Sequence, residues 1–209
     1  MDADPDQLAD CAREFEAKLM ALATHADPER LQRRFPLWAC VATWSDPGVV
    51  RRVSDRLFAL DIGALPPLGR LLDRHARLAL LDRESLLRQL ATLALARRPG
   101  VLRSCVAREA RGDLRRVLGD AFDALMSISQ LGRPRSERVA HWTPGHWAWV
   151  GYFDWTGLLQ NDDAALRRTV RMSLPATLFS MKNLRLVAAD FTQDEALALM
   201  ADHGMEWSC

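Results

Sequence analysis

"RESLLRQLATLALARRPG", residues 83–100, is the stretch that decides the fold. From Leu86 to Ala96 its residues are apolar nearly all round, and they do not show the strict alternation that marks a half-buried strand. A helix that is apolar on every side is buried among other elements. Pro99 and Gly100 end this helix, since proline and glycine interrupt helical patterns. We therefore expect a central, buried helix with the other segments packed around it.

The segments on either side of this helix repeat apolar residues every three or four positions, as amphipathic helices do. The first stripe consists of Leu8, Ala12, Phe15, Leu19 and Leu22. No run of alternating, β-branched residues bounded by turns is present. The sequence therefore predicts an all-α fold: a single compact multi-helix domain over residues 1–209 with short connecting loops. A subdivision is expected, if anywhere, at the polar loop "LGRPRSER", residues 131–138.

Several helix starts can be predicted from local signals. Asp27-Pro28 and Asp46-Pro47 each place a capping side chain before a proline at the first helical position. Thr192, followed three residues later by Glu195, matches the capping box. Periodicity further predicts one helix over residues 68–81 and one long helix, capped by Asp113, with apolar residues from Leu114 to Ile128.

The residues that common catalytic motifs require are scarce in this chain. Neither Lys18 nor Lys182 follows a glycine-rich loop, and no G-x-S-x-G or H-E-x-x-H motif is present. The four cysteines are far apart, which predicts neither a zinc site nor a compact disulfide framework. A pair of catalytic carboxylates distant in sequence stays open. We predict a protein without enzymatic activity, cofactor or metal.

His141, His146 and Asp154 are the best candidates for a metal site. The two histidines are five residues apart and therefore do not share a helical face, and Pro144-Gly145 places a turn between them. We favour a chance pair over a metal site. A small helical metal- or ligand-binding enzyme that uses these three side chains is the alternative function, and metal analysis of the purified protein would distinguish it.

The segment "AHWTPGHWAWVGYFDWTG", residues 140–157, holds four of the seven tryptophans. A helix that starts after Pro144 would carry aromatic side chains on all sides. Such a helix is either fully buried or packs one face on the core and offers another to a partner, since aromatic residues are enriched at interface hot spots. We expect the core to be its main role, with one or two rings exposed for docking. Trp142, Trp147 and Trp149 are the candidates.

Composition argues against nucleic acid and against membrane insertion. The formal net charge is only +1, and although residues 70–116 carry twelve arginines, five acids are interleaved with them. The preference for arginine over lysine suits phosphate recognition, but we favour coding bias as its cause. The start, "MDADPDQLAD", lacks the features of an export signal, and no stretch approaches the roughly 18 apolar residues of a membrane-spanning helix. These features predict a soluble, cytoplasmic protein.

The central region resembles a known family. "GALPPLGRLLDRHARLALLDRESLLRQLATLALARRPGVLRSCV", residues 63–106, is similar to the central region of the SctK family, the YscK, PscK and Hrp-type accessory proteins of bacterial type III secretion systems. The resemblance depends on the G-A-L-P turn at 63–66, a leucine-rich helix with a charged face, and an apolar helix that leads to R-x-C-V at 103–106. It covers part of the chain and carries no catalytic signature.

The resemblance implies a non-enzymatic cytoplasmic adaptor of the sorting platform of the injectisome. One surface would meet the cytoplasmic domain of the inner-membrane ring protein, which is SctD-like, and another the pod protein, which is SctQ-like. The protein would then lie at the cytoplasmic face of the inner membrane through its partners. Because complementary charge steers assembly, we predict that Arg108, Arg111 and Arg115 contact one of these partners.

Overall fold

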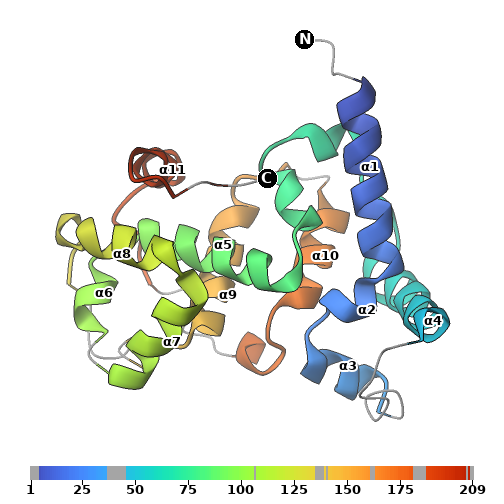
Figure 1. The fold of residues 1–209 in the computed structure, drawn as a ribbon, viewed down its shortest axis with the longest axis horizontal. Helices are drawn as coiled ribbons and strands as arrows, with labels where there is room; N and C mark the ends of the chain where they lie inside the picture. The colour runs from blue at the N-terminus through green and yellow to red at the C-terminus, as the bar shows by residue number, and fades with distance from the viewer. Residues whose placement is uncertain are drawn as a thin grey trace. The chain divides into compact units, whose positions relative to one another are not determined.

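The structure is a computed structural model that describes residues 5–36, 46–105, 107–134, 139, 141–160, 163–180, 187–205 and 207 (Figure 1). Its regular elements are helices and helical turns, and none of these residues lies in a strand. The predicted all-α fold is confirmed.

The described residues form two compact units. Unit 1 takes in those of Met1–Leu86 and Leu159–Thr177, and unit 2 those of Leu87–Leu158 and Leu178–Ser208. The single domain over 1–209 stays a prediction, and so does the subdivision at 131–138. Residues 135–138 of that loop lie outside the described part of the chain, and the described residues on both sides of it belong to unit 2.

Unit 1 is built from helices and helical turns. These are α1 (Pro5–Met20), α2 (Leu22–His25), α3 (Pro28–Arg34), α4 (Pro47–Leu57), the π-helical turn η1 (Phe58–Ile62), the 3₁₀ turns η2 (Leu68–Leu72) and η3 (Ala76–Leu80), and α10 (Ala164–Ser173). α2 and α4 lie against each other, as Figure 1 shows. One hydrophobic cluster in the core of the unit consists of Leu22, Ala23, Ala26, Leu31, Val53, Leu57, Ile62, Ala165 and Met172.

The two predicted aspartate caps of unit 1 are confirmed. Asp27 accepts a hydrogen bond from the N–H of Arg30 at 3.2 Å, and Asp46 accepts one from the N–H of Gly48 at 2.8 Å. Each cap satisfies an N–H that has no partner inside its helix. Asp27 also forms an ion pair with Arg83 at 3.0 Å, so one side chain caps α3 and fixes a residue distant in the sequence.

The prediction of one helix over residues 68–81 is wrong, because the structure has two separate 3₁₀ turns, η2 and η3, in this range. Asp73 ends η2 in an extended conformation, and its side chain accepts a hydrogen bond from the N–H of His75 at 2.7 Å. Aspartate competes in this way with the helical hydrogen bonds of the backbone. Arg70 of η2 pairs at 2.6 Å with the fully buried Asp163, and this hydrogen-bonded guanidinium holds the pKa of Asp163 below its usual value.

Lys18 of α1 is buried in unit 1, where its ammonium donates a hydrogen bond to the carbonyl of Leu81. Burial lowers the pKa of Lys18 from 10.5 to about 8, while the nearby Asp82 carboxylate acts in the opposite direction. Between these pH values the unfolded chain keeps a proton that the folded chain has lost, and stability therefore rises with pH.

We expect the free energy of unfolding to increase between pH 8 and pH 10.5 by at most about 3 kcal/mol. Urea denaturation at several pH values measures this rise. Lys18→Met should remove it, whatever its effect on stability at neutral pH. An equal rise in the variant would assign the pH dependence to other groups.

Unit 2 contains most of α5 (Arg83–Ala96), whose first residues belong to unit 1. Its other elements are α6 (Val101–Ser104), α7 (Arg108–Leu118), α8 (Asp120–Ser127), the 3₁₀ turn η4 (Ser129–Leu131), α9 (Pro144–Thr156), the turn η6 (Thr177–Ser180), which begins at the last residue of a unit 1 segment, and α11 (Gln193–Asp202). Every residue of α5 from Leu90 to Ala96 is buried, as predicted, whereas Arg88, in the first half of the predicted stretch, is exposed. The capping box of Thr192 and Glu195 at the start of α11 is also confirmed.

The prediction of a single helix from Leu114 to Ile128 is wrong, because Gly119 separates two helices, α7 and α8, in this range. Gly119 has φ 58° and ψ −133°, a conformation that is essentially confined to glycine. Asp113 does not cap a helix. It lies inside α7, which begins at Arg108, and its carboxylate pairs with Arg116.

Candidate partner-binding surface

The tryptophan-rich segment forms α9, a core helix of unit 2. Trp147, Trp149 and Trp155 are fully buried, and Trp142, before the helix, is 8% exposed. Their rings contact one another or neighbouring aromatic rings; the ring centroids of Trp142 and Trp147, for example, lie 5.0 Å apart. The expectation that the core is the main role of this segment agrees with this burial.

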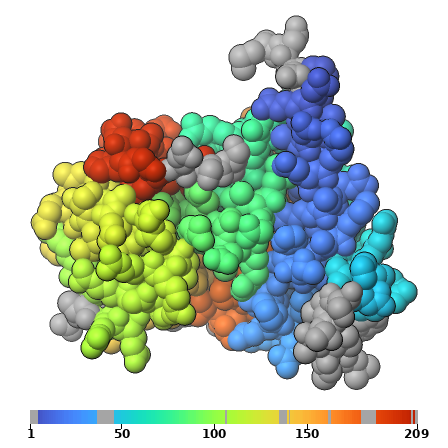
Figure 2. All heavy atoms as spheres, in the orientation of Figure 1, coloured from blue at the N-terminus to red at the C-terminus, as the bar shows by residue number. Residues whose placement is uncertain are grey.

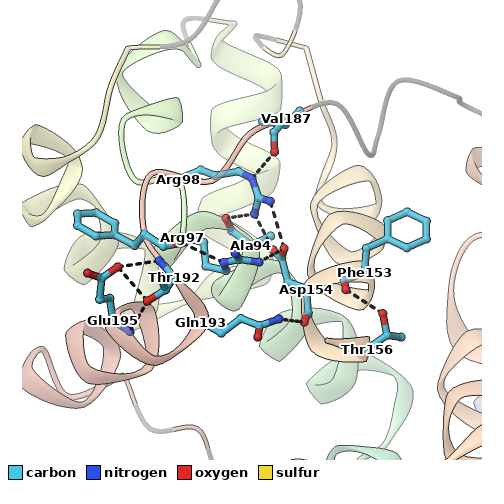
Figure 3. A network of polar contacts seen from close by, with 11 residues as sticks. Ala94, Arg97, Arg98, Phe153, Asp154, Thr156, Val187, Thr192, Gln193 and Glu195 are labelled. Carbon is cyan, nitrogen blue, oxygen red and sulfur yellow. Dashed lines mark hydrogen bonds and ion pairs between the residues drawn. The ribbon is translucent and has the colours of Figure 1, made fainter. Parts of the chain in front are cut away.

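Asp154 of α9 is the centre of a buried ion-pair network in unit 2 (Figure 3). Arg98 bonds both carboxylate oxygens, with its Nη1 2.6 Å from Oδ2 and its Nη2 3.1 Å from Oδ1, and Arg97 pairs with Oδ1 as well. The remaining donors of Arg98 reach backbone carbonyls: Nε donates to Val187 at 2.8 Å, and Nη1 also donates to Ala94 at 3.2 Å. Such hydrogen bonds offset the cost of burying the charges.

The same network holds the chain that leads to α11. The backbone N–H groups of Asp190 and Phe191 donate to the carbonyl of Arg97, at 2.8 and 3.2 Å. Gln193, the first residue of α11, donates from its side-chain amide to the carbonyl of Asp154 at 2.5 Å (Figure 3). The acidic C-terminal helix is thereby fixed to the ends of α5 and α9.

Two of the three candidate metal ligands, His146 and Asp154, have other roles in the structure. Nδ1 of His146 accepts a hydrogen bond from the N–H of Thr143 at 3.0 Å and completes a capping box for α9, and burial lowers the pKa of this imidazole. His141 is exposed. Both oxygens of Asp154 are engaged by guanidinium groups, whose positive charge opposes a metal ion. No group of three or more potential ligands that could hold a metal is found within the described part of the chain.

The three predicted partner-binding arginines lie on the exposed face of α7. Arg108, Arg111 and Arg115 are all exposed, whereas the opposite face of the helix is buried through Ala110, Leu114 and Leu118. α7 packs on α8 and α9 through this buried face. We call Arg108, Arg111 and Arg115 the α7 surface; the atoms of this helix, drawn in yellow-green, are visible in Figure 2.

The arginines of the α7 surface differ in their partners. Arg115 pairs with Asp123 at 3.2 Å, and both side chains are about two-thirds exposed, so this pair adds little to stability. Arg108 and Arg111 form no ion pair with any residue that the structure describes. Their positive charge is therefore available to an acidic partner.

The structure thus separates the two sets of residues proposed for partner binding. The arginines share one exposed helix face. Trp142, Trp147 and Trp149 are buried in unit 2, where the rings of Trp142 and Trp147 contact each other and the ring of Trp149 contacts Tyr152 and Phe153. Their role in partner binding stays a prediction, and the α7 surface offers the more direct test.

Sequence reasoning missed Arg97 and Arg98 as the partners of Asp154. A signal was present, because two adjacent arginines follow directly on a helix that is apolar all round. Charges at the end of a buried helix require a buried counter-charge. The identity of that acid depends on the tertiary fold and could not be found from spacing.

Comparison with known families assigns the class. Residues 3–202 match a family described as a bacterial type III secretion protein, so the chain is a protein of that secretion system. In particular, it belongs to the HrpB4 family of type III secretion proteins. This membership confirms the resemblance to SctK-type proteins in the central region. No curated protein and no solved structure gives a significant match.

No helix among the described residues combines the length and the apolar character that crossing a membrane requires.

Proposed function

We propose that this type III secretion protein is a non-enzymatic adaptor of the sorting platform. It acts at the cytoplasmic face of the inner membrane, where it links the cytoplasmic domain of the SctD-like ring protein to the SctQ-like pod protein. Its mechanism is recognition by complementary surfaces, and it uses no cofactor.

The exposed arginine face of α7 is the observation that supports this proposal best. The helix is fixed from behind by buried apolar residues, so its charged face is presented on a rigid element. Arg108 and Arg111 lack ion-pair partners among the described residues. Unpaired surface charge of one sign accelerates association with an oppositely charged protein and excludes wrong partners. Family membership supplies the secretion system in which such partners are found.

Charge reversal on α7 tests the proposal. The triple variant Arg108→Glu, Arg111→Glu, Arg115→Glu should keep its fold, because all three side chains are exposed. It should bind one of the two proposed partners about 10- to 100-fold more weakly and leave the other unaffected. Purified ring-protein domain and purified pod protein, each titrated separately against the wild type and the variant, give these affinities.

A matched control reverses three exposed arginines elsewhere, namely Arg13, Arg33 and Arg74. This control carries the same change in net charge, and both partners should bind it as they bind the wild type. Wild-type protein that binds neither partner would contradict the adaptor function. An α7 variant that binds both partners normally would exclude this face as the contact.

A further inference from the structure

α4 of unit 1 presents a second arginine-rich face. Its inner side is buried through Val50, Val53, Ser54 and Leu57. Its outer side exposes Arg51, Arg52 and Arg56 against a single acid, Asp55. Nη1 of Arg51 donates a hydrogen bond to the sulfur of Met20 at 3.8 Å, and none of the three arginines forms an ion pair with a described residue.

Exposed leucines follow α4 along the chain. Leu60, Leu65 and Leu68 are 43%, 63% and 53% exposed, and Met20, beside Arg51, is 37% exposed. These four are among only five large apolar side chains that are exposed in the described part of the chain. A single exposed leucine is ordinary on a protein surface, whereas apolar side chains that together form a larger exposed patch mark an interaction site.

The backbone around Leu60, the first of these leucines, is held in place. η1 packs against α4 and continues it as a π-helical turn, a feature frequent at functional sites. The N–H of Gly63 donates to the carbonyl of Phe58 at 2.8 Å, and Arg168 of α10 donates to the carbonyl of Ile62 at 2.9 Å. Ile62 is buried in the core, whereas Leu60 of the same turn is exposed.

The charges and the apolar residues together define what fits this face. Three arginines without ion-pair partners favour acidic side chains, and the leucines favour apolar ones. A protein segment that alternates the two, such as an acidic amphipathic helix, satisfies both. A membrane fits less well, because interfacial helices bury their apolar face in the bilayer and that of α4 is in the core of unit 1.

We propose that Arg51, Arg52 and Arg56 with Leu60, Leu65 and Leu68, here called the α4 surface, bind an acidic amphipathic segment of a protein partner. The identity of that partner rests on the proposed adaptor function: it is the one of the two that does not use the α7 surface. Unit 1 then binds one neighbour in the sorting platform and unit 2 the other. α4, in cyan, is visible at the surface in Figure 2.

Two variants of the full chain test the α4 surface. One carries Arg51→Glu, Arg52→Glu and Arg56→Glu, and the other Leu60→Ser, Leu65→Ser and Leu68→Ser. Purified ring-protein domain and purified pod protein are titrated separately against each. Both variants should bind the same partner at least about tenfold more weakly and keep the other, whereas the α7 variant should show the reverse. Arg→Lys at the three α4 positions keeps the charge and should retain most of the affinity.

The outcomes separate this inference from the proposed function. Wild-type protein that binds neither partner overturns the adaptor function and this inference with it. Wild-type protein that binds both, with normal binding by the α4 variants, overturns this inference alone. Loss of binding to vesicles of phosphatidylcholine and phosphatidylserine in the arginine variant, with both protein partners unaffected, also overturns it in favour of a membrane. If the leucine variant does not fold, the arginine positions alone test the inference: weaker partner binding by the Glu variant but not by the Lys variant supports it, and equal binding by both overturns it.

Discussion

Asp154→Ala is expected to lower the free energy of unfolding by about 3–5 kcal/mol, because it leaves two guanidinium groups without their counter-charge. Arg98 is 5% exposed and bonds both oxygens of Asp154, so it cannot recover the lost interaction from water. The variant also weakens the attachment of α11, since Arg97 and Asp154 both contact the chain that leads to it. Urea denaturation followed by tryptophan fluorescence reports the change, because α9 carries three buried tryptophans.

A double-mutant cycle assigns this loss to the ion pairs. Asp154→Ala combined with Arg98→Ala should cost less than the sum of the two single changes, by about 1 kcal/mol or more, because the second change removes the charge that the first left unpaired. Asp202→Ala, an exposed acid of α11, is the control and should change stability by less than about 0.5 kcal/mol. A loss below about 1 kcal/mol for Asp154→Ala would show that the network contributes little.

The sequence predicted those parts of the fold that depend on neighbouring residues. The caps at Asp27, Asp46 and Thr192 were found because a capping side chain bonds an N–H two or three positions away. The buried α5 was found because an apolar surface on all sides has no other stable location. In each case the residues that determine the structure lie close together in the sequence.

Two helix boundaries were missed for a common reason. Hydrophobic periodicity continues through both Asp73 and Gly119, so it predicts continuous helices there. Asp73 instead bonds the backbone two residues onward, and Gly119 takes a conformation that other residues avoid. A stripe of apolar residues shows which face is buried, but it does not show whether the backbone stays helical between them.

The candidate site was predictable only in part. The charge map of the sequence located the arginines that α7 exposes, because their spacing follows one helix face. It could not pair Asp154 with Arg97 and Arg98, which are more than 50 positions away. The sequence also contained no sign of the α4 surface. Whether Leu60 and Leu65 are exposed depends on which of the nearby apolar residues pack into the core, and only the tertiary structure shows this.

Gly151→Ala is expected to destabilise unit 2 by about 3 kcal/mol or more, because the backbones of α5 and α9 meet at this position. A Cβ on Gly151 would lie 1.8 Å from the carbonyl oxygen and 2.5 Å from the carbonyl carbon of Leu90. The obstacle is backbone, which no rotamer change removes. The two helices would have to separate, and the fully buried Trp147 and Trp155 of α9 would lose packing contacts.

Gly112→Ala is the matched control for this substitution. Gly112 is an exposed residue inside α7, and a Cβ there meets no atom within 4 Å. Alanine should therefore stabilise the protein by about 0.5–1 kcal/mol, through its higher helix propensity. The two variants make the same chemical change and should shift the urea midpoint in opposite directions. Equal midpoints for Gly151→Ala and the wild type would mean that α5 and α9 do not approach as closely as this contact requires.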